Sequence, residues 1–197
     1  MTKVKHFVLA ALAALLLAAC GEPEPQFKLR DITGLMPELE FELTRAEDGE
    51  TVTAADYRGG VTVVFFGFTN CPDICPTTLA RFAAALDRLE PEAADDVRVL
   101  FVSVDPQRDT LERLRGYVNA FGPHFTGLRG PQSELREVTK RYRVTYGYGE
   151  PDASGYYDVS HSSAAFVFDR DNEIRLLVRG DDPIADIAHD LGVLAGG

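Results

Sequence analysis

The stretch at residues 61–76, VTVVFFGFTNCPDICP, constrains the fold of this chain most. Residues 61–68 form an almost unbroken run of apolar, β-branched and aromatic side chains. Such a run is typical of a central strand covered on both faces, as in a parallel sheet. Cys71 and Cys75 follow, and a helical pattern begins at Pro76, whose missing N–H costs nothing in a first turn. The thiols are therefore predicted at a strand-to-helix turn, where the positive end of a helix dipole favours thiolate.

Residues 1–19 have the pattern of a secretory signal. Lys3 and Lys5 form a basic start, and residues 7–17 form an apolar run that is too short to span a bilayer as a helix. The end of the pattern, Leu-Ala-Ala-Cys-Gly, resembles the lipobox of bacterial lipoproteins. This resemblance implies cleavage before Cys20, a lipid on its sulfur, and a membrane-anchored protein that faces the periplasm. An ordinary cleaved signal followed by a spare cysteine is the alternative.

The rest of the chain is predicted to form a short tether and one domain. Residues 20–30 begin with the lipidated cysteine and include a stiff segment with two prolines. Residues 31–197 are long enough to bury the core of a single domain. The chain has 20 basic and 31 acidic residues, and loss of Lys3 and Lys5 would leave a net charge of about −13. A surface this acidic argues against nucleic acid or an anionic membrane surface as a binding partner.

The order of predicted elements indicates an α/β fold of the thioredoxin-like type. An N-terminal hairpin leads into the central strand, strands and helices then alternate, and a second hairpin and a helix close the chain. The predicted elements are a hairpin at 39–52, strands at 61–68, 97–104 and 125–128, helices at 77–89, 110–121, 133–142 and 183–194, and a hairpin at 164–178. The strand–helix–strand unit needs a parallel crossover, while the last hairpin makes the central sheet mixed. Residues 146–157, rich in tyrosine and glycine, are predicted to be an irregular, exposed insertion before that hairpin.

The spacing of the cysteines suits a soft metal ion as well as redox chemistry. A Cys-x-x-x-Cys pair at the start of a helix places its sulfurs at positions i and i+4, close to one face. Thioredoxin-type redox motifs use Cys-x-x-Cys instead. The extra residue does not forbid a disulfide, and it leaves room for an ion between the sulfurs. Two thiolates suit Cu(I) or Zn(II), and an added imidazole would also suit Cu(II). Two buried cysteines that only pack are the alternative.

Three histidines are candidates for a third ligand. His161 precedes a predicted strand, and in a thioredoxin-like sheet the loop that enters this strand faces the cysteine turn. His124 follows a Gly-Pro break in a loop, and His189 lies in the last predicted helix. Lone histidines are often structural, so the spacing alone leaves the role of His161 open.

Three motifs together resemble the Sco (SCO1/SenC/PrrC) family. They are F-x-x-T-x-C-P-D-I-C-P, V-S-V-D-P-x-R-D-T and V-x-H-S, and they span residues 66–162. The resemblance implies a membrane-tethered, thioredoxin-fold copper chaperone for the binuclear CuA centre of cytochrome c oxidase. It implies that Cys71, Cys75 and His161 hold one copper ion, as Cu(I) or Cu(II). It also implies the CuA-bearing oxidase subunit as a partner, together with another copper chaperone or a thiol reductant.

One position departs from the pattern of the family, which commonly has Val-Asp-His before the strand. Here Ser160 stands in the place of the aspartate. The loss of a group that orients a metal ligand weakens metal affinity roughly 10–100-fold. Asp105 and Asp158 are the candidates to compensate, although Asp105 could instead cap the loop in which it lies.

A second hypothesis is a thiol–disulfide oxidoreductase that reduces the cysteines of the oxidase copper subunit or of another extracytoplasmic partner. Cys71 or Cys75 would attack the disulfide of the partner, and the other cysteine would resolve the mixed disulfide. His161 would then adjust the pKa of the thiols. A peroxide-reducing enzyme shares the fold, but it explains the Cys-x-x-x-Cys pair and its flanking prolines poorly.

Overall fold

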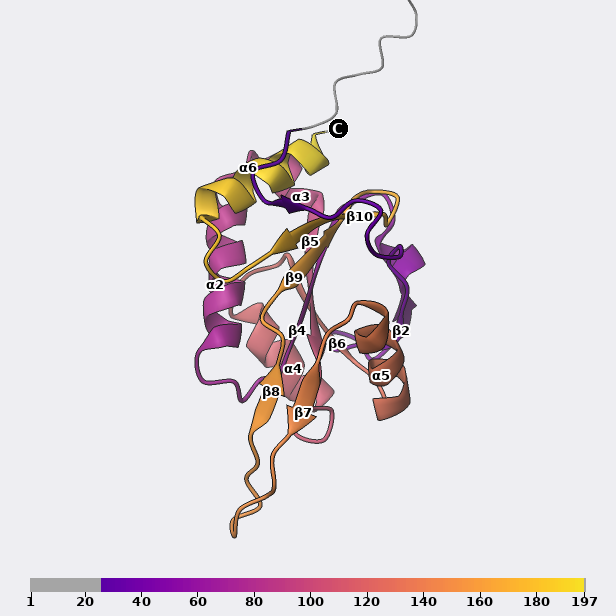
Figure 1. Ribbon diagram of the computed structural model, residues 1–197, viewed down its shortest axis with the longest axis vertical. Helices are drawn as coiled ribbons and strands as arrows, with labels where there is room; N and C mark the ends of the chain where they lie inside the picture. Colours follow the sequence, from indigo (N-terminus) through magenta and orange to yellow (C-terminus); the bar gives the residue numbers. More distant parts are fainter. Residues whose placement is uncertain (1–25, 197) are drawn as a thin grey trace, which may run out of the picture.

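A mixed sheet of eight strands forms the centre of this computed structural model, which describes residues 26–196. The predicted signal, residues 1–19, and Cys20 lie outside the described residues. The strand order in the sheet is β1-β10-β9-β4-β5-β6-β2-β3, and β7 and β8 form a separate two-stranded ribbon (Figure 1). Within residues 26–196, no helix has the length and apolar character needed to cross a membrane.

The elements follow the predicted order. The strands are β1 (Arg30–Asp31), β2 (Glu42–Arg45), β3 (Thr51–Thr53), β4 (Val61–Gly67), β5 (Val97–Ser103), β6 (Phe125–Arg129), β7 (Tyr146–Tyr148), β8 (Val159–His161), β9 (Ala165–Phe168) and β10 (Ile174–Val178). The helices are η1 (Ala54–Tyr57), α2 (Ile74–Leu86), α3 (Pro91–Asp95), α4 (Leu111–Asn119), α5 (Gln132–Arg141) and α6 (Ile184–Ala195).

Strand β4 is the centre of the sheet, as its apolar run predicts. All seven of its residues are buried. It pairs in parallel with β5 and antiparallel with β9, and β5 pairs in parallel with β6. The parallel crossover and the antiparallel hairpin β9–β10 make the sheet mixed, which confirms the predicted fold class.

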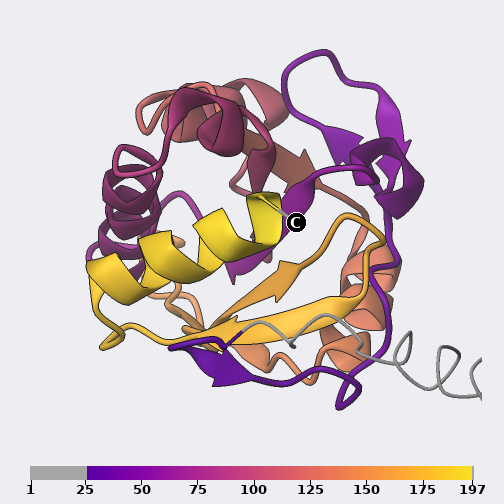
Figure 2. The same ribbon diagram turned by 90° about the horizontal axis from the view of Figure 1, so that it is seen from above.

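Helices cover both faces of the sheet, so the core has two halves (Figure 2). On one face, α2, α4 and α6 contribute side chains such as Leu79, Leu114 and Leu191. On the other face, α5 contributes Leu135 and the segment before β2 contributes Phe41. A strand between two such layers has no solvent-facing side, which explains why β4 lacks the alternation of polar and apolar residues seen in half-exposed strands.

The start of the described chain is fixed to α6 by a buried carboxylate. The side chain of Asp190 accepts hydrogen bonds from the backbone N–H groups of Lys28 at 2.9 Å and Leu29 at 2.8 Å. Strand β1 follows directly and pairs with β10. The predicted tether, residues 20–30, overlaps this packed segment. In Figure 1, α6 lies at the opposite end of the molecule from the ribbon β7–β8.

The base of the insertion differs from its prediction as an irregular segment. Residues 146–148 pair with residues 159–161 as an antiparallel ribbon, with Tyr146 opposite His161 and Tyr148 opposite Val159. Tyrosine favours extended backbone, and its side chains pack across the ribbon. The tip, residues 149–156, is exposed as predicted.

Candidate metal centre

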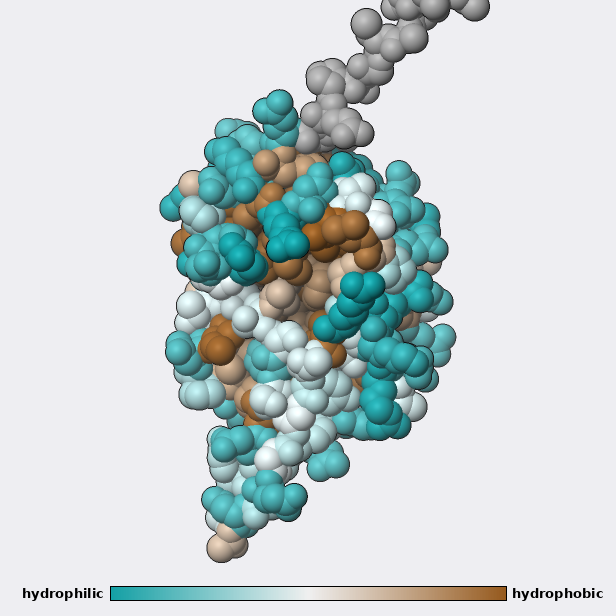
Figure 3. All heavy atoms as spheres, viewed as in Figure 1, coloured by the Kyte–Doolittle hydropathy of each residue, from teal (hydrophilic) through white to brown (hydrophobic). Residues whose placement is uncertain are grey.

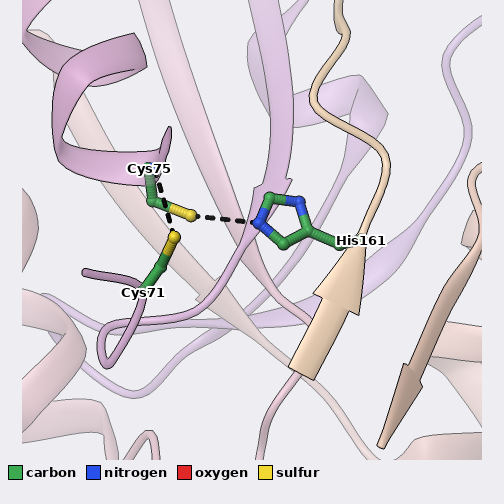
Figure 4. A group of neighbouring side chains, drawn as sticks. All are labelled: Cys71, Cys75 and His161. Carbon is green, nitrogen blue, oxygen red and sulfur yellow. Dashed lines mark hydrogen bonds between the residues drawn. The ribbon is translucent and has the colours of Figure 1, made fainter. Parts of the chain in front are cut away.

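Two thiols and one imidazole meet at the carboxyl end of β4. The Sγ atoms of Cys71 and Cys75 and a ring nitrogen of His161 all lie within 4.8 Å of one another. Cys71 comes from the loop after β4, Cys75 from the first turn of α2 and His161 from the end of β8 (Figure 4). The structure thus brings together the three residues that the motifs single out.

The two cysteines occupy different environments. Helix α2 begins at Ile74, so Cys75 lies in its first turn, and the backbone N–H of Cys75 donates a hydrogen bond to the Sγ atom of Cys71 at 3.3 Å. Both are free cysteines, with Cys71 partly exposed and Cys75 buried. Burial raises the pKa of the Cys75 thiol well above its ordinary value. A metal ion at this site would therefore have to displace the proton of Cys75.

Gly67, the last residue of β4, makes room for the Cys75 sulfur. A Cβ atom at this position would lie 2.7 Å from the Sγ atom of Cys75 and 2.6 Å from a ring carbon of Phe101. Both distances are shorter than van der Waals contact permits. A glycine is therefore required here for the thiol to pack against the end of the strand.

The buried carboxylate of Asp109 holds the cysteine loop. It accepts hydrogen bonds from the Thr69 N–H at 3.0 Å, the Thr69 Oγ1 at 2.5 Å and the Ser103 Oγ at 2.6 Å. Helix α4 begins at Leu111, two residues after Asp109. The structure assigns the cap to Thr110, whose side chain accepts from the Arg113 N–H. Asp109 instead ties the loop before Cys71 to the end of β5.

His161 presents a lone pair to the thiols. Its Nδ1 atom lies 2.9 Å from the backbone carbonyl oxygen of Ser162, which can only accept, so Nδ1 carries the proton of the neutral ring. The Nε2 atom lies 3.3 Å from the Sγ atom of Cys75. Burial lowers the pKa of His161 below its ordinary value of 6.5. The rings of Phe65 and Phe68 stand edge-on to the imidazole, with centroids 6.0 and 5.7 Å away.

The other histidines lie apart from this cluster. The Nδ1 atom of His124 lies 3.4 Å from a guanidinium nitrogen of Arg98. The Nδ1 atom of His189 lies 2.7 Å from the carboxylate of Asp190, in the last helix. Of the three candidate histidines, the structure places only His161 beside the thiols.

The acidic candidates do not touch the imidazole. Asp105 is fully buried, but it pairs with Arg108 and accepts from the Tyr157 hydroxyl at 2.7 Å. Asp158 is exposed and accepts from the Tyr156 hydroxyl at 3.3 Å. Ser160 is also exposed, and because side chains alternate along a strand, it projects from the opposite face of β8 to His161. The backbone carbonyl of Ser162 orients the ring in place of a carboxylate.

The donor set suits a soft metal ion. Thiolate sulfurs select Cu(I) or Zn(II), and an unprotonated imidazole nitrogen also suits Cu(II). The hydrogen bond from Nδ1 is the kind of outer partner that fixes the orientation of a metal-binding histidine. The residues present therefore fit a soft ion such as copper.

The fold and the site define a thioredoxin-like domain with a Cys-x-x-x-Cys pair and a histidine at one centre. The family model described as SCO1/SenC matches residues 36–195. The chain belongs to the SCO1/SenC family.

Relatives and solved structures agree with this assignment. Protein SCO1 homolog 1, mitochondrial, of Arabidopsis thaliana is 42% identical over 127 residues, which are 64% of this chain and 37% of that protein. The chain thus spans little more than a third of that relative. Bradyrhizobium japonicum ScoI with copper bound is 34% identical, with a TM-score of 0.72 over 80% of this chain and 98% of that one. BsSco, a member of the Sco family of cytochrome c oxidase assembly proteins in which a disulfide switch was identified, is 26% identical. Its TM-score is 0.63 over 85% of this chain and 97% of that one.

Proposed function

We propose that this protein is a copper-binding metallochaperone for assembly of the CuA centre of cytochrome c oxidase. One copper ion would be held by Cys71, Cys75 and His161. The observation that carries the proposal is the meeting of these three donor atoms within 4.8 Å. Membership of the SCO1/SenC family and the copper-bound state of the similar ScoI structure support it.

The site geometry suggests an order for copper transfer. Cys71 lies in a loop and is partly exposed, whereas Cys75 is buried. A thiolate of the acceptor would therefore replace Cys71 first and Cys75 last, exchanging one metal–sulfur bond at a time. The acceptor would be the CuA-bearing subunit of the oxidase, and another copper chaperone or a thiol reductant would load the site or keep it reduced.

The place of the protein is part of the same proposal. A lipid on Cys20 would anchor the chain to the membrane, and the domain would face the periplasm, where a CuA centre is assembled. A Bacillus anthracis protein with the same fold is described as a SCO1/SenC family lipoprotein. Mass spectrometry of the mature protein tests this point, because lipidation adds a diacylglyceryl group to Cys20 and cleavage removes residues 1–19.

A second candidate function, thiol–disulfide exchange, is favoured by the short distance between two free thiols, whose sulfurs lie within 4.8 Å of each other. The thiolate of Cys71 would attack a disulfide of the partner and release one partner thiolate. The thiolate of Cys75 would then attack the Cys71 sulfur and release the second. Two electrons would pass to the partner, which leaves as a dithiol, and this protein would keep the disulfide. The disulfide switch described for BsSco supports this candidate.

Copper titration separates the two candidates. The chain would carry Cys20→Ala, so that Cys71 and Cys75 supply the only thiols, and both would be reduced before Cu(I) or Cu(II) is added. The chaperone predicts one copper per chain and, with Cu(II), an intense thiolate-to-copper absorption band. His161→Ala should remove the Cu(II) band, whereas His124→Ala, which changes a histidine outside the cluster, should keep it. Oxidation of the thiols with loss of the copper would contradict the chaperone and leave the reductase as the function.

A further inference from the structure

The third donor of the site comes from a different part of the fold than the two thiols. Cys71 and Cys75 follow the central strand of the main sheet, whereas His161 ends β8 in the ribbon. Each strand of the ribbon has three residues, and neither pairs with the main sheet. On the face seen in Figure 3, the part of the molecule that projects below carries mostly hydrophilic and intermediate residues. The position of β8 therefore depends on its pairing with β7, on the short segment that leads into β9 and on the side chains that attach the ribbon to the main domain.

Arg108 attaches the segment that leads into β8 to the main domain. It lies in the loop after β5, beside the fully buried carboxylate of Asp105, with which it forms an ion pair. One of its guanidinium nitrogens, Nη1, donates to the backbone carbonyl of Tyr157 at 2.9 Å. The centre of the guanidinium lies 3.9 Å from the centroid of the Tyr157 ring. The Tyr157 hydroxyl completes the cluster by donating to Asp105 at 2.7 Å.

The same guanidinium also reaches the ring that packs on His161. Its centre lies 5.8 Å from the centroid of Phe68, on the side of the cysteine loop. The Phe68 ring stands edge-on to the imidazole of His161 at 5.7 Å. Arg108 therefore contacts both the backbone that leads to His161 and the aromatic wall against which His161 lies.

The β7 arm has an attachment of its own. The Tyr148 hydroxyl donates to the Val104 carbonyl at 2.5 Å and accepts from the Gln132 side chain at 2.8 Å. These contacts hold β7 to the loop after β5 and to α5 without Arg108. Loss of the Arg108 contacts would leave β8 held only by its pairing with β7 and by the short segment that leads into β9. We expect the imidazole then to move relative to the thiols.

We propose that Arg108, Asp105 and Tyr157 form a latch that holds His161 beside the thiols and thereby decides which oxidation state of copper the site retains. The latch is a positioning device, because none of its three side chains belongs to the donor cluster. With the latch closed, two sulfurs and the imidazole are available together. With the latch open, only the two sulfurs remain. This inference rests on the proposed copper function.

The chemistry of the two ions gives the latch its selectivity. Cu(I) is a soft ion for which two thiolates are sufficient ligands, whereas Cu(II) needs the imidazole as well. An open latch would therefore weaken Cu(II) binding and leave Cu(I) binding close to its original strength. The loss in Cu(II) affinity is expected to be roughly 10–100-fold, as for other groups that orient a metal ligand.

Two conservative variants test the latch in the full chain carrying Cys20→Ala. Arg108→Lys keeps a positive charge near Asp105, but it loses the planar fork that bonds to the Tyr157 carbonyl and stacks on its ring. Tyr157→Phe keeps the ring and loses only the hydroxyl that donates to Asp105. The matched controls are Tyr156→Phe, which removes an exposed hydroxyl from the tip next to Tyr157, and Arg58→Lys, an arginine that pairs with Glu38 on the surface at 3.7 Å.

Copper affinity and ring contacts are the two measurements. Cu(I) and Cu(II) affinities would be determined by competition with chelators. In copper-free protein, nuclear Overhauser contacts between the His161 and Phe68 rings would report the position of the imidazole. We expect both latch variants to lose these contacts and most of their Cu(II) affinity while they keep Cu(I) affinity. Both controls should behave like the unmodified chain.

The possible failures can be told apart. Latch variants that keep the ring contacts overturn the latch, whatever their copper affinity. Equal losses for Cu(I) and Cu(II) overturn its role in selecting the oxidation state. If the unmodified chain binds neither ion, the proposed function fails, and the ring contacts alone then decide whether the latch exists. If Arg108→Lys does not fold, Tyr157→Phe decides.

Discussion

The Nε2 atom of His161 lies 3.3 Å from the Sγ atom of Cys75, although 86 residues separate them in the chain. The contact exists because β4 and β9 are neighbours in the sheet, so the turn that leaves one strand meets the segment that enters the other. The pairing of the two strands alone does not set the distance between the Cys75 thiol and the His161 ring. This distance is set by the residues that support the thiol and the ring, and several of them lead to a prediction.

Substitution of Gly67 by alanine should displace the Cys75 sulfur. The new Cβ atom would lie 2.7 Å from Sγ and 2.6 Å from the Phe101 ring, so one of these groups must move. We expect a loss of about 1–3 kcal/mol in the free energy of unfolding, together with weaker copper binding. Urea unfolding and copper titration check both.

Gly116→Ala is the matched control for this substitution. Gly116 is exposed in α4, and a Cβ atom there would have no neighbour within 4 Å. Alanine should stabilise the helix by roughly 0.5–1 kcal/mol. If both variants were equally stable, steric contact at Gly67 would not be what positions the sulfur.

Substitution of Asp109 by asparagine should loosen the cysteine loop. An amide has one acceptor oxygen where the carboxylate has two, so either Thr69 or Ser103 would lose its partner inside the protein. We expect a loss of about 1–3 kcal/mol in the free energy of unfolding and faster amide hydrogen exchange at Thr69. Asp171→Asn, at an exposed hairpin position, should change neither quantity. Unchanged exchange at Thr69 would show that the loop holds its shape without Asp109.

The buried imidazole should make the copper-free protein less stable in acid. In the unfolded chain His161 binds a proton as the pH falls below 6.5. In the folded protein burial lowers the pKa of His161 below that value. Between these two pKa values the unfolded state binds more protons, so the stability contributed by neutral His161 is lost as the pH falls through this window. Urea unfolding of the wild type and of His161→Gln over this range checks the prediction, because the difference between them should shrink in acid. A constant difference would contradict it.

Copper binding should release protons at neutral pH. Burial raises the pKa of Cys75 above its ordinary value of 9.0, so this sulfur is a thiol before the metal arrives. Affinity for Cu(I) should therefore rise with pH, and Cys75→Ser should remove this dependence along with much of the binding. Proton release during titration in weakly buffered solution measures the effect directly. Binding without proton release would mean that Cys75 is already a thiolate.

Removal of the Asp190 carboxylate should release the start of the domain from α6. Asp190→Ala leaves the N–H groups of Lys28 and Leu29 without their acceptor, which should cost about 1–3 kcal/mol. Amide exchange at these two residues should speed up. Asp186→Ala is the control on the same helix, since its surface ion pair with Lys28 at 3.7 Å should contribute less than about 1 kcal/mol. Equal effects from the two variants would mean that the negative charge of the helix, and not the hydrogen bonds of the buried carboxylate, holds the start of the domain.

The fold could be predicted because its central strand has a pattern that is visible in the sequence alone. The run at residues 61–68 can be buried on both faces only in a covered sheet, and the alternation of elements after it requires a parallel crossover. The ribbon lacks such a signature. Its strands β7 and β8 have three residues each and are joined by residues 149–158, a segment that includes two glycines and two tyrosines. Helix α3 was not predicted: Pro91, two residues after the predicted helix at 77–89, is its first residue.

The site could be predicted in its donors but not in their supports. Cysteine spacing identifies both thiols, and the place of His161 before β9 follows from the fold. The partner of its Nδ1 atom is a backbone carbonyl, which every residue has, so no side-chain pattern marks it. Asp109 and Asp105 lie in one motif, and Asp105 could have served only as a cap of its own loop. Their real partners, Thr69 and Tyr157, lie 40 and 52 residues away in the chain.

The bond between Asp190 and the backbone of residues 28 and 29 also determines how far the metal centre can reach. It makes the chain enter the domain beside α6, at the end opposite the ribbon (Figure 1). Any surface to which the upstream residues are attached would then lie beside α6, and His161 with its neighbouring thiols would lie toward the other end of the domain. Rotation about this entry point would carry Cys71 along a wider arc than any site near α6 could follow. With a short tether, the volume within which the metal centre could meet a partner would thus be set mainly by the length of the folded domain.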